Sequence, residues 1–564
     1  MFRSITDLAI RHGILADHRK EEYRGLPPEE ALKQIAVDTE RRTQSRQDSA
    51  SRELQLLRAI ARECSLEVVD LEQYEPNREL FDLIAFPILF KHQIIPIDCQ
   101  DGVLVIATSA PLDDEILAKI GSETGLGVDL ALAESEQIRT FLKEHVGVAG
   151  ATVGDMLTGD EAESSPEDLD EADAERLAQQ SSVVKLVNEL LMDAVESGAS
   201  DIHIEPADVS FGIRYRIDGM LIDQTVPADL SRFHAAIVSR LKIMAKLNVA
   251  EKRLPQDGRI KIKVGPITVD IRISTIPMVH GESIVLRLLR QGGKSWGFGQ
   301  LDMSPELEDS FRSIAQSPHG IFLVTGPTGS GKTTTLYNTL HELRVSRPQT
   351  KIITIEDPVE YSLPGVHQIQ VNDTTGLTFA RGLRSVLRHD PDVVLVGEIR
   401  DQETAKSAVQ AALTGHLVVS TLHTNDSASA FTRLCEMGVE PYLVASTVRA
   451  VVAQRLVRRL CTHCKQVQSN TDNHTLAKAS GAEKIYEALG CRECGESGYK
   501  GRMALFELLV SDEKIRDLCT QRSPAFEILE YAQTQGLKTL SDSGWECVRK
   551  GLTSPAEVAR VAGV

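Results

Sequence analysis

The segment 321–335, IFLVTGPTGSGKTTT, constrains the fold more than any other part of the sequence. An apolar run typical of a buried strand leads directly into a glycine-rich loop, and a helical stretch follows. Residues 326–333 fit the pattern GxxxxGK[ST] at every fixed position. In such a loop the glycines let backbone N–H groups turn inward on phosphates, and the next helix adds the positive end of its dipole. The segment therefore predicts a strand–loop–helix unit that holds a nucleoside triphosphate.

Two side chains of this loop have predicted roles. Lys332 can reach the β- and γ-phosphates, and the hydroxyl of Thr333 can ligate Mg²⁺. The nucleotide contacts predicted from the pattern are Gly326, Pro327, Thr328, Gly329, Ser330, Gly331, Lys332 and Thr333.

Around this loop the sequence alternates apolar runs with helical stretches. The runs GIFLVTG, KIITIED, DVVLVGE and LVVSTLH are nearly all apolar, as strands buried on both faces are. Such alternation predicts an α/β domain with a doubly wound parallel sheet.

Three of these predicted strands end in residues that suit phosphate chemistry. Glu398 closes VVLVGE, Glu356 lies in ITIEDPVEY beside Asp357 and Glu360, and His423 follows STL. Because the carboxyl ends of strands form the ligand crevice of an open α/β sheet, we expect these groups to converge on the nucleotide. Hydrolysis needs an acidic group near the metal and the attacking water, and an imidazole can stabilise transferring charge. Each residue taken alone is also compatible with a solvated or capping side chain.

The remaining sequence predicts several further parts, because 564 residues are too many for one hydrophobic core. Residues 1–147 are expected to form an N-terminal domain, with a polar helical lead and a small α/β part. Residues 148–180 predict a flexible linker, since nine of the 16 residues from Asp160 to Glu175 are acidic. Residues 181–300 predict a mixed α+β domain, and 301–564 the domain that carries the loop.

Charge and hydropathy exclude some classes of function. The net charge of −19 argues against non-specific binding of nucleic acid. No stretch approaches 18 uninterrupted apolar residues, so we expect no membrane span. The opening MFRSITDLAIRHGIL has no signal-peptide pattern, which makes the cytoplasm the expected location.

Four cysteines predict a structural zinc site. Cys461 and Cys464 form one CxxC pair, Cys491 and Cys494 form another, and 26 residues separate the pairs. Two such pairs supply the tetrahedral thiolate set that structural Zn²⁺ prefers, with no open position for a substrate. The long spacing predicts a small inserted subdomain at about 458–500. Four incidental cysteines are the alternative.

Several segments together resemble one family. The runs EKRLPQDGRI, IRISTIPMVHGESIVLRLL, GPTGSGKTTTLY, IEDPVEY, TFARGLRSVLRHDPDVVLVGEIRD, ALTGHLVVSTLHTNDS and VVAQRLVRRLC are similar to the secretion ATPases. The likeness covers about residues 180–510. Within that family, the sequence most resembles the assembly motors of type II secretion systems and type IV pili.

This resemblance implies a RecA-like ATPase domain preceded by a smaller PAS-like domain, in a ring of six subunits. It extends the Walker A loop to Thr334, makes Glu356 the residue that positions or deprotonates the attacking water, and makes Glu398 the Walker B acid. His423 becomes the His-box residue. Arg214 and Arg216 in IRYRIDG match arginines that the smaller domain brings to the triphosphate, although either could form a surface salt bridge instead. The implied cofactors are ATP, Mg²⁺ and Zn²⁺.

The resemblance also implies partners at the membrane. The front domain would dock on the cytoplasmic part of a bitopic inner-membrane protein, and the ring would act on a polytopic platform protein, peripheral to the inner membrane. In some relatives the front domain binds cyclic di-GMP through a motif containing RLGxxL, but the opening of this chain lacks Arg-Leu-Gly, which disfavours that ligand.

The expected function is therefore ATP-driven pseudopilus assembly for type II secretion. The tetracysteine insert disfavours a retraction motor, and GYKGRMALFELLVSDEKIRDL leans towards secretion rather than pilus assembly, which is the alternative. Two other classes stay open: a RecA-like motor on DNA, which should show a basic channel with aromatic residues, and a docking module that binds ATP without turnover.

Overall fold

The structure is a computed structural model, and it describes residues 49–562 with gaps at 72–73, 75–76, 82, 85–87, 90–91, 111–113, 147–151, 153–179, 208–210, 265–266, 292–296 and 469–483. The opening segment lies outside the described residues, as does the predicted acidic linker except for Thr152 and Gln180. Contacts divide the chain into two compact units, Met1–Arg290 and Gln291–Val564. Each unit is described by itself.

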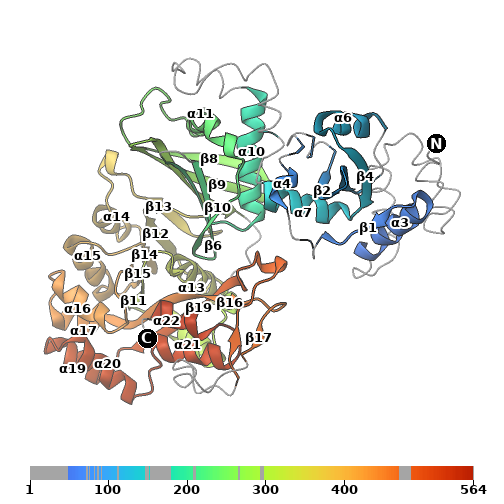
Figure 1. The fold of residues 1–564 in the computed structure, drawn as a ribbon. Coiled ribbons are helices and arrows are strands. Elements are labelled where there is room, and N and C mark those ends of the chain that lie inside the picture. The colour runs from blue at the N-terminus through green and yellow to red at the C-terminus, as the bar shows by residue number, and fades with distance from the viewer. Residues whose placement is uncertain are drawn as a thin grey trace. The chain divides into compact units, whose positions relative to one another are not determined.

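The first unit begins with a four-stranded sheet in the order β1-β4-β3-β2 (Figure 1). Strands β2 and β3 form an antiparallel hairpin across Asp101 and Gly102, which both have positive φ, while β3–β4 and β4–β1 are parallel. This arrangement is the small α/β part expected near the N-terminus. The elements are α3 (Ser49–Cys64), β1 (Glu67–Val68), α4 (Arg78–Phe81), β2 (Ile94–Gln100), β3 (Val103–Thr108), α6 (Asp114–Thr124), β4 (Gly127–Leu132) and α7 (Ser135–Val146).

A second, six-stranded sheet of this unit has the order β7-β6-β5-β10-β9-β8. Strands β6 and β9 alternate buried residues with more exposed ones; in β6, Phe211, Ile213 and Tyr215 are buried, and the residues between them are not. The buried face packs on the apolar stripes of α10 and α11. The elements are α10 (Ser181–Glu196), β5 (Asp201–Pro206), β6 (Phe211–Ile217), β7 (Met220–Asp223), α11 (His234–Ala245), β8 (Gln256–Val264), β9 (Ile267–Met278) and β10 (Gly281–Gln291).

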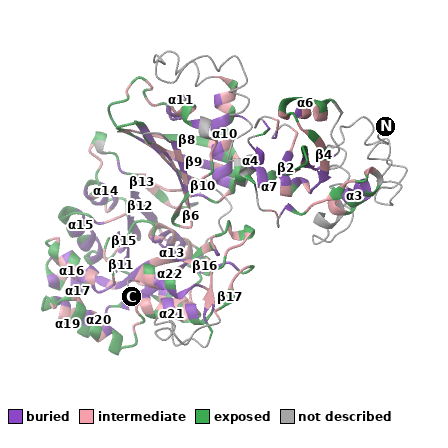
Figure 2. Cartoon of the chain, in the orientation of Figure 1, coloured by how far each residue is buried: buried purple, intermediate pink, exposed green. Residues whose placement is uncertain are grey.

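The second unit is built on a seven-stranded sheet in the order β13-β12-β14-β15-β11-β16-β19. Strands β13 to β16 of this order pair in parallel, and β19 is antiparallel to β16. Every residue of β11, β12, β14 and β15 is buried, which confirms the strands expected from the four apolar runs (Figure 2). The strands are β11 (Gly320–Thr325), β12 (Ile352–Glu356), β13 (His367–Gln370), β14 (Val393–Val396), β15 (Leu417–Leu422), β16 (Val448–Leu460) and β19 (Tyr499–Val510).

Helices cover both faces of this sheet, because successive side chains of each strand point to opposite faces. Phe322 and Val324 of β11 join the core formed with α12 and α13, whereas Ile321 and Leu323 join the core formed with α14 to α17, α19 and α20. Two further helices, α21 and α22, pack near β16 and β19. The helices are α12 (Pro305–Ala315), α13 (Lys332–Ser346), α14 (Phe379–Val386), α15 (Gln402–Leu413), α16 (Ser429–Glu436), α17 (Pro441–Thr447), α19 (Glu513–Thr520), α20 (Ala525–Thr534), α21 (Leu540–Arg549) and α22 (Pro555–Ala562).

Between β16 and β19 the chain forms a small lobe. The short strands β17 (Gln466–Val467) and β18 (Tyr486–Glu487) pair antiparallel within it. This lobe contains both CxxC pairs.

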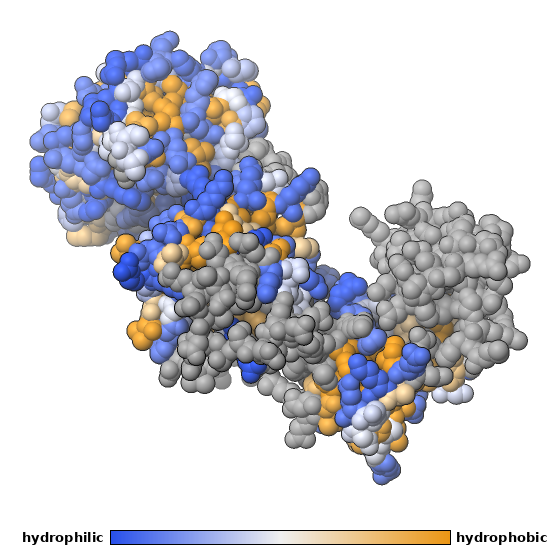
Figure 3. Space-filling model, turned by 90° about the horizontal axis from the view of Figure 1, so that it is seen from above, coloured by the Kyte–Doolittle hydropathy of each residue, from blue (hydrophilic) through white to orange (hydrophobic). Residues whose placement is uncertain are grey.

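On the face drawn in Figure 3 most of the coloured surface is hydrophilic, and apolar side chains form smaller areas between. Among the helices in the described part of the chain, none is both long enough and apolar enough to cross a bilayer.

Candidate nucleotide site

The glycine-rich loop of residues 326–331, called the P-loop, joins β11 to α13 and lies against β16. Gly326 has a φ of 149°, and a Cβ there would lie 2.5 Å from the carbonyl oxygen of Gln454. Gly331 has a φ of 87°, and its Cβ would lie 2.8 Å from the side-chain nitrogen of the same glutamine. Both positions therefore require glycine for conformation and for space.

Lys332 folds back on the loop. Its Nζ donates hydrogen bonds to the carbonyl oxygens of Gly326, at 2.8 Å, and Pro327, at 3.0 Å. The pKa of Lys332 is lowered to about 8, chiefly by burial; the Glu398 carboxylate opposes this shift, and the charge of Arg455 adds to it. In the part of the chain that the structure describes, this desolvated ammonium group bonds to carbonyl oxygens alone, so it is poised to interact with a phosphate.

Glu398 and His423 meet at the ends of neighbouring strands. Nε2 of His423 lies 3.3 Å from Oε2 of Glu398, and Arg400 pairs with the other carboxylate oxygen. Glu398 follows β14 and His423 follows β15; these strands pair in parallel, so their carboxyl ends lie side by side.

Glu356 is only 4% exposed and is held by three side chains. One carboxylate oxygen accepts hydrogen bonds from Thr354, at 2.5 Å, and from Gln368, at 3.1 Å, while the other accepts one from Tyr337. Burial raises the pKa of Tyr337, and the Glu356 carboxylate raises it further, so this phenol stays a donor. Glu356 is thus firmly positioned by neutral donors.

A single cavity of about 140 Å³ brings most of the predicted residues together. Its lining includes Lys332, Thr333, Glu356, Glu398 and His423, together with Asp357 and Glu360. The expected convergence at the carboxyl edge of the sheet is therefore seen, while the roles assigned to each residue stay predictions.

Arg214 and Arg216 belong to the first unit, whereas the residues of this cavity belong to the second. Both lie on β6 of the first unit, where Nε of Arg214 lies 2.8 Å from Glu205 and Nε of Arg216 lies 3.8 Å from Asp201. The salt-bridge alternative is therefore realised, and their role toward a triphosphate stays a prediction.

Several residues of the site were not predicted from the sequence. Gln454 is 1% exposed, and its Oε1 accepts a 2.8 Å hydrogen bond from Thr335 in the first turn of α13. Tyr337 and Gln368 hold Glu356. No local pattern signals these contacts, since Gln454 and Thr335 are 119 positions apart.

The four cysteines of the CxxC pairs form one cluster, with all sulfur atoms within 4.8 Å of one another. Three sulfur–sulfur distances are 3.7–3.8 Å. A tetrahedral zinc site with Zn–S bonds of about 2.3 Å has sulfur–sulfur edges of about 3.8 Å, so the cluster fits Zn²⁺. Backbone N–H groups of Cys491 and Gly498 also donate to the sulfur of Cys494, at 3.2 Å each, which suits a thiolate ligand.

The fold and this site define a P-loop nucleotide-binding protein of the RecA-like class. The family model described as "Type II/IV secretion system protein" matches residues 176–560, and a second model, "MshEN domain", matches residues 64–152. The chain therefore belongs to the type II/IV secretion system protein family.

Curated relatives carry two kinds of name. The "Type IV pilus assembly ATPase PilB" of Myxococcus xanthus is 38% identical over 519 residues, which cover 90% of this chain and 91% of the relative. The "Type II secretion system protein HxcR" of Pseudomonas aeruginosa is 48% identical over 379 residues, 67% of this chain and 77% of the relative. The "Type II secretion system ATPase E" of Vibrio cholerae is 47% identical over 382 residues, which cover 67% of this chain and 75% of the relative.

Among solved structures, the ATPase DotB of Legionella pneumophila matches 66% of this chain and 94% of its own length. Its TM-score is 0.50 at 21% identity, a likeness of fold alone. Together these comparisons confirm the predicted family, the fold class and, with the family, the enzyme class of ATP hydrolases.

Proposed function

We propose that this chain is an ATP-driven motor that couples hydrolysis at its P-loop to pseudopilus assembly and protein export through a type II secretion system. The observation that carries the proposal is that one cavity is lined by Lys332 and by the Glu398–His423 pair. Family membership supports the same conclusion.

The residues of the cavity divide the work of phosphoryl transfer. Backbone N–H groups of the loop and Lys332 bind the β- and γ-phosphates, and Lys332 exchanges its carbonyl partners for phosphate oxygens. His423, paired with Glu398, stabilises charge at the transferred group. Glu356 orients or deprotonates the attacking water, with its orientation set by Tyr337 and Gln368.

Thr333 and Glu398 line the same cavity and offer the oxygen donors that suit Mg²⁺. When bound, Mg²⁺ neutralises charge on the phosphate oxygens. Thr333 would bind the ion directly, and Glu398 would hold it through water. Arg214 and Arg216 are proposed to add positive charge at the triphosphate from the first unit.

The cysteine lobe is proposed to bind structural Zn²⁺ through Cys461, Cys464, Cys491 and Cys494. Zinc would close this lobe without taking part in hydrolysis, because four thiolates leave no open position.

Assembly and location are part of the same proposal. Six copies form a ring, the front domain docks on a bitopic inner-membrane protein, and the ring acts on a polytopic platform protein at the cytoplasmic face of the membrane. Nucleic acid is not a substrate, which agrees with the net charge of −19.

Type IV pilus assembly is the second candidate. It is favoured by the relatives named PilB, one of which matches 90% of this chain, including its front part. The two candidates share the motor and differ in the filament that it builds.

A deletion strain tests the proposal and separates the candidates. Loss of protein export with normal surface pili supports secretion, and loss of pili with normal export supports pilus assembly. Wild-type chain should restore the lost function, whereas Lys332→Ala should not. A strain that keeps both functions, or full rescue by Lys332→Ala, would contradict the proposed motor.

A further inference from the structure

The last part of β16 lies beside the P-loop. In the register of the sheet, Thr325 at the end of β11 pairs with Ala453 on one side and with Leu422 of β15 on the other. The residues that follow these three therefore share the carboxyl edge of the sheet. Gln454 and Arg455 flank the loop on one side, and the segment that begins with His423 flanks it on the other.

Arg455 spans the two sides. Its Nη2 donates to the carbonyl oxygen of Asn425, at 2.9 Å, and lies 3.4 Å from the Oδ1 of the same residue. Its Nη1 donates to the carbonyl oxygen of Gln454 and lies 3.0 Å from where a Cβ of Gly326 would be. The guanidinium thus reaches from β16, past the first residue of the P-loop, to the loop that carries His423.

The charge of Arg455 is only weakly compensated. The side chain is half-buried, and this desolvation lowers the pKa of Arg455 against the opposing fields of Glu507 and Asp426. Within the described ranges its hydrogen bonds end on carbonyl and amide oxygens, and no carboxylate forms an ion pair with it. A desolvated cation without an acidic partner is costly, so its place beside a phosphate-binding loop calls for an explanation.

The segment 423–427 is tied to three strands. The N–H of Thr424 donates to Oγ1 of Thr325 at 2.8 Å, and Ser427 donates to the buried carboxylate of Glu507 on β19 through its N–H, at 2.8 Å, and its hydroxyl, at 2.6 Å. Between Thr424 and Ser427, Asn425 accepts the hydrogen bond from Arg455, which connects the segment to β16. Arg455 is therefore a cationic link between β16, next to the P-loop, and this segment.

We propose that Arg455 is a positioning residue of the nucleotide site, which holds the segment 423–427 against the P-loop so that His423 stays paired with Glu398 opposite Lys332. The inference rests on the proposed ATP hydrolysis. It adds a residue of the same chain that acts through His423 rather than on the substrate. A lysine there could keep the charge but not span both sides, because it lacks the planar fork of donors.

A double-mutant cycle tests this coupling in the full-length chain. Arg455→Ala should lower kcat by about 10- to 100-fold, with KM changed by less than about threefold, because misplacing a catalytic group costs that much. In a His423→Ala background the same change should cost less than about threefold, since the group that Arg455 positions is already gone. Arg455→Lys should restore part of the loss.

Arg459→Ala is the matched control. Arg459 lies on the same strand but pairs with Asp302, so its loss should leave kcat and KM at wild-type values. Unchanged kcat in Arg455→Ala, or the full loss repeated in the His423→Ala background, would overturn the inference.

Amide hydrogen exchange decides the inference independently of turnover. The peptide that covers 423–427 should exchange faster in Arg455→Ala and Arg455→Lys than in wild type, while Arg459→Ala should not change it. If exchange stayed at the wild-type rate, the inference would fail. If the wild-type chain did not hydrolyse ATP while exchange changed as expected, only the proposed function would fall.

Discussion

Nε2 of His423 lies 3.3 Å from the carboxylate of Glu398, although 25 positions separate the two residues. The contact exists because β14 and β15 pair in parallel and end at the same edge of the sheet. An imidazole and a carboxylate thus line the same cavity as Lys332 and Thr333 of the P-loop.

Replacing Glu398 with glutamine should abolish most turnover while nucleotide still binds. The amide keeps the shape but removes the negative charge that pairs with His423 and that is proposed to hold Mg²⁺, and we expect kcat to fall by at least about 100-fold. Phosphate release and the binding of a fluorescent ATP analogue measure the two effects. Glu403→Gln, at an exposed carboxylate paired with Arg384, is the control and should keep wild-type kcat. Wild-type kcat in Glu398→Gln would remove this residue from the site.

Glu356→Gln should reduce both stability and turnover. A glutamine places an NH₂ group among Tyr337, Thr354 and Gln368, which all donate to Glu356, so at least one buried donor loses its acceptor. The expected loss in the free energy of unfolding is about 1–3 kcal/mol, read from denaturant unfolding. Unchanged stability would show that these hydrogen bonds do not hold Glu356 in solution.

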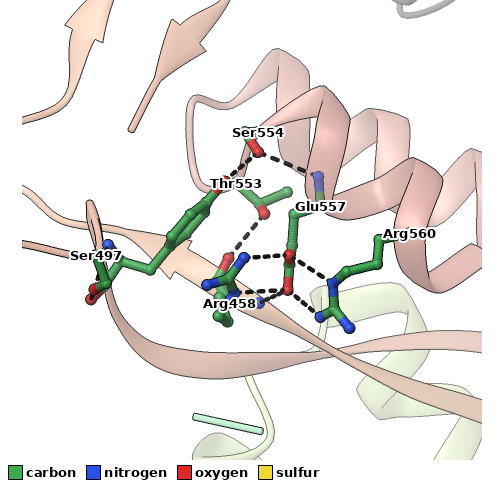
Figure 4. Close-up of polar contacts among 7 residues, drawn as sticks. Arg458, Ser497, Thr553, Ser554, Glu557 and Arg560 are labelled. Carbon is green, nitrogen blue, oxygen red and sulfur yellow. Dashed lines mark hydrogen bonds and ion pairs between the residues drawn. The ribbon is translucent and has the colours of Figure 1, made fainter. Parts of the chain in front are cut away.

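Glu557 should anchor the C-terminal helix to the sheet. Its carboxylate is 1% exposed and receives both Arg458 of β16 and Arg560 of α22, as Figure 4 shows. The guanidinium of Arg458 also lies 4.0 Å from the ring centre of Tyr499. Because Glu557→Gln leaves two arginines without their carboxylate, it should destabilise the chain by about 3–5 kcal/mol. Glu493→Gln, at an exposed pair with Lys500, should cost less than about 1 kcal/mol.

The same carboxylate sets a pH dependence. Burial would raise the pKa of Glu557, but hydrogen bonds from Arg560 and Arg458 outweigh it and bring the pKa to about 2. A folded pKa below the unfolded value of about 4.3 means that the stabilisation is complete above about pH 5 and is lost as the pH falls toward 2. Unfolding curves across this range should converge for wild type and Glu557→Gln at the acid end. A stability difference that did not shrink on acidification would contradict this assignment.

Removing zinc should loosen the cysteine lobe. The four sulfur atoms lie within 4.8 Å of one another, and without a cation such a cluster has little to hold it together. Metal analysis of protein never exposed to a chelator should find zinc in wild type and none in Cys491→Ser, with a lower thermal midpoint in the variant. Cys99→Ser, at a half-buried thiol of β2, should keep the zinc. Wild-type protein without zinc would rule the site out.

The sequence predicted the sheet, and it predicted the functional side chains at the carboxyl edge of the sheet, because both predictions depend on local sequence pattern. Apolar runs read as buried strands, and Glu398 and His423 were expected together because parallel strands end at one edge. The order of the strands in the sheet is not encoded in any local sequence pattern, so the sequence did not predict that β16 lies beside β11. For that reason Gln454 and Arg455 were missed, whose partners lie up to 119 positions away.

Three acidic residues that lie close together in the sequence differ in how far they are buried. Glu356, Asp357 and Glu360 read as one acidic group, but Glu356 is buried while Asp357 and Glu360 are more exposed. The difference arises because Glu356 is still part of β12, and Tyr337, Thr354 and Gln368 enclose it.

Phosphate release from Mg²⁺-ATP by the purified full-length chain, compared with Lys332→Ala, tests the central claim most directly. We predict multiple turnovers that require Mg²⁺ and that fall to background in Lys332→Ala, because the loop then loses the charge that meets the β- and γ-phosphates. Turnover at the wild-type rate in Lys332→Ala, or none beyond a single cycle in wild type, would contradict it.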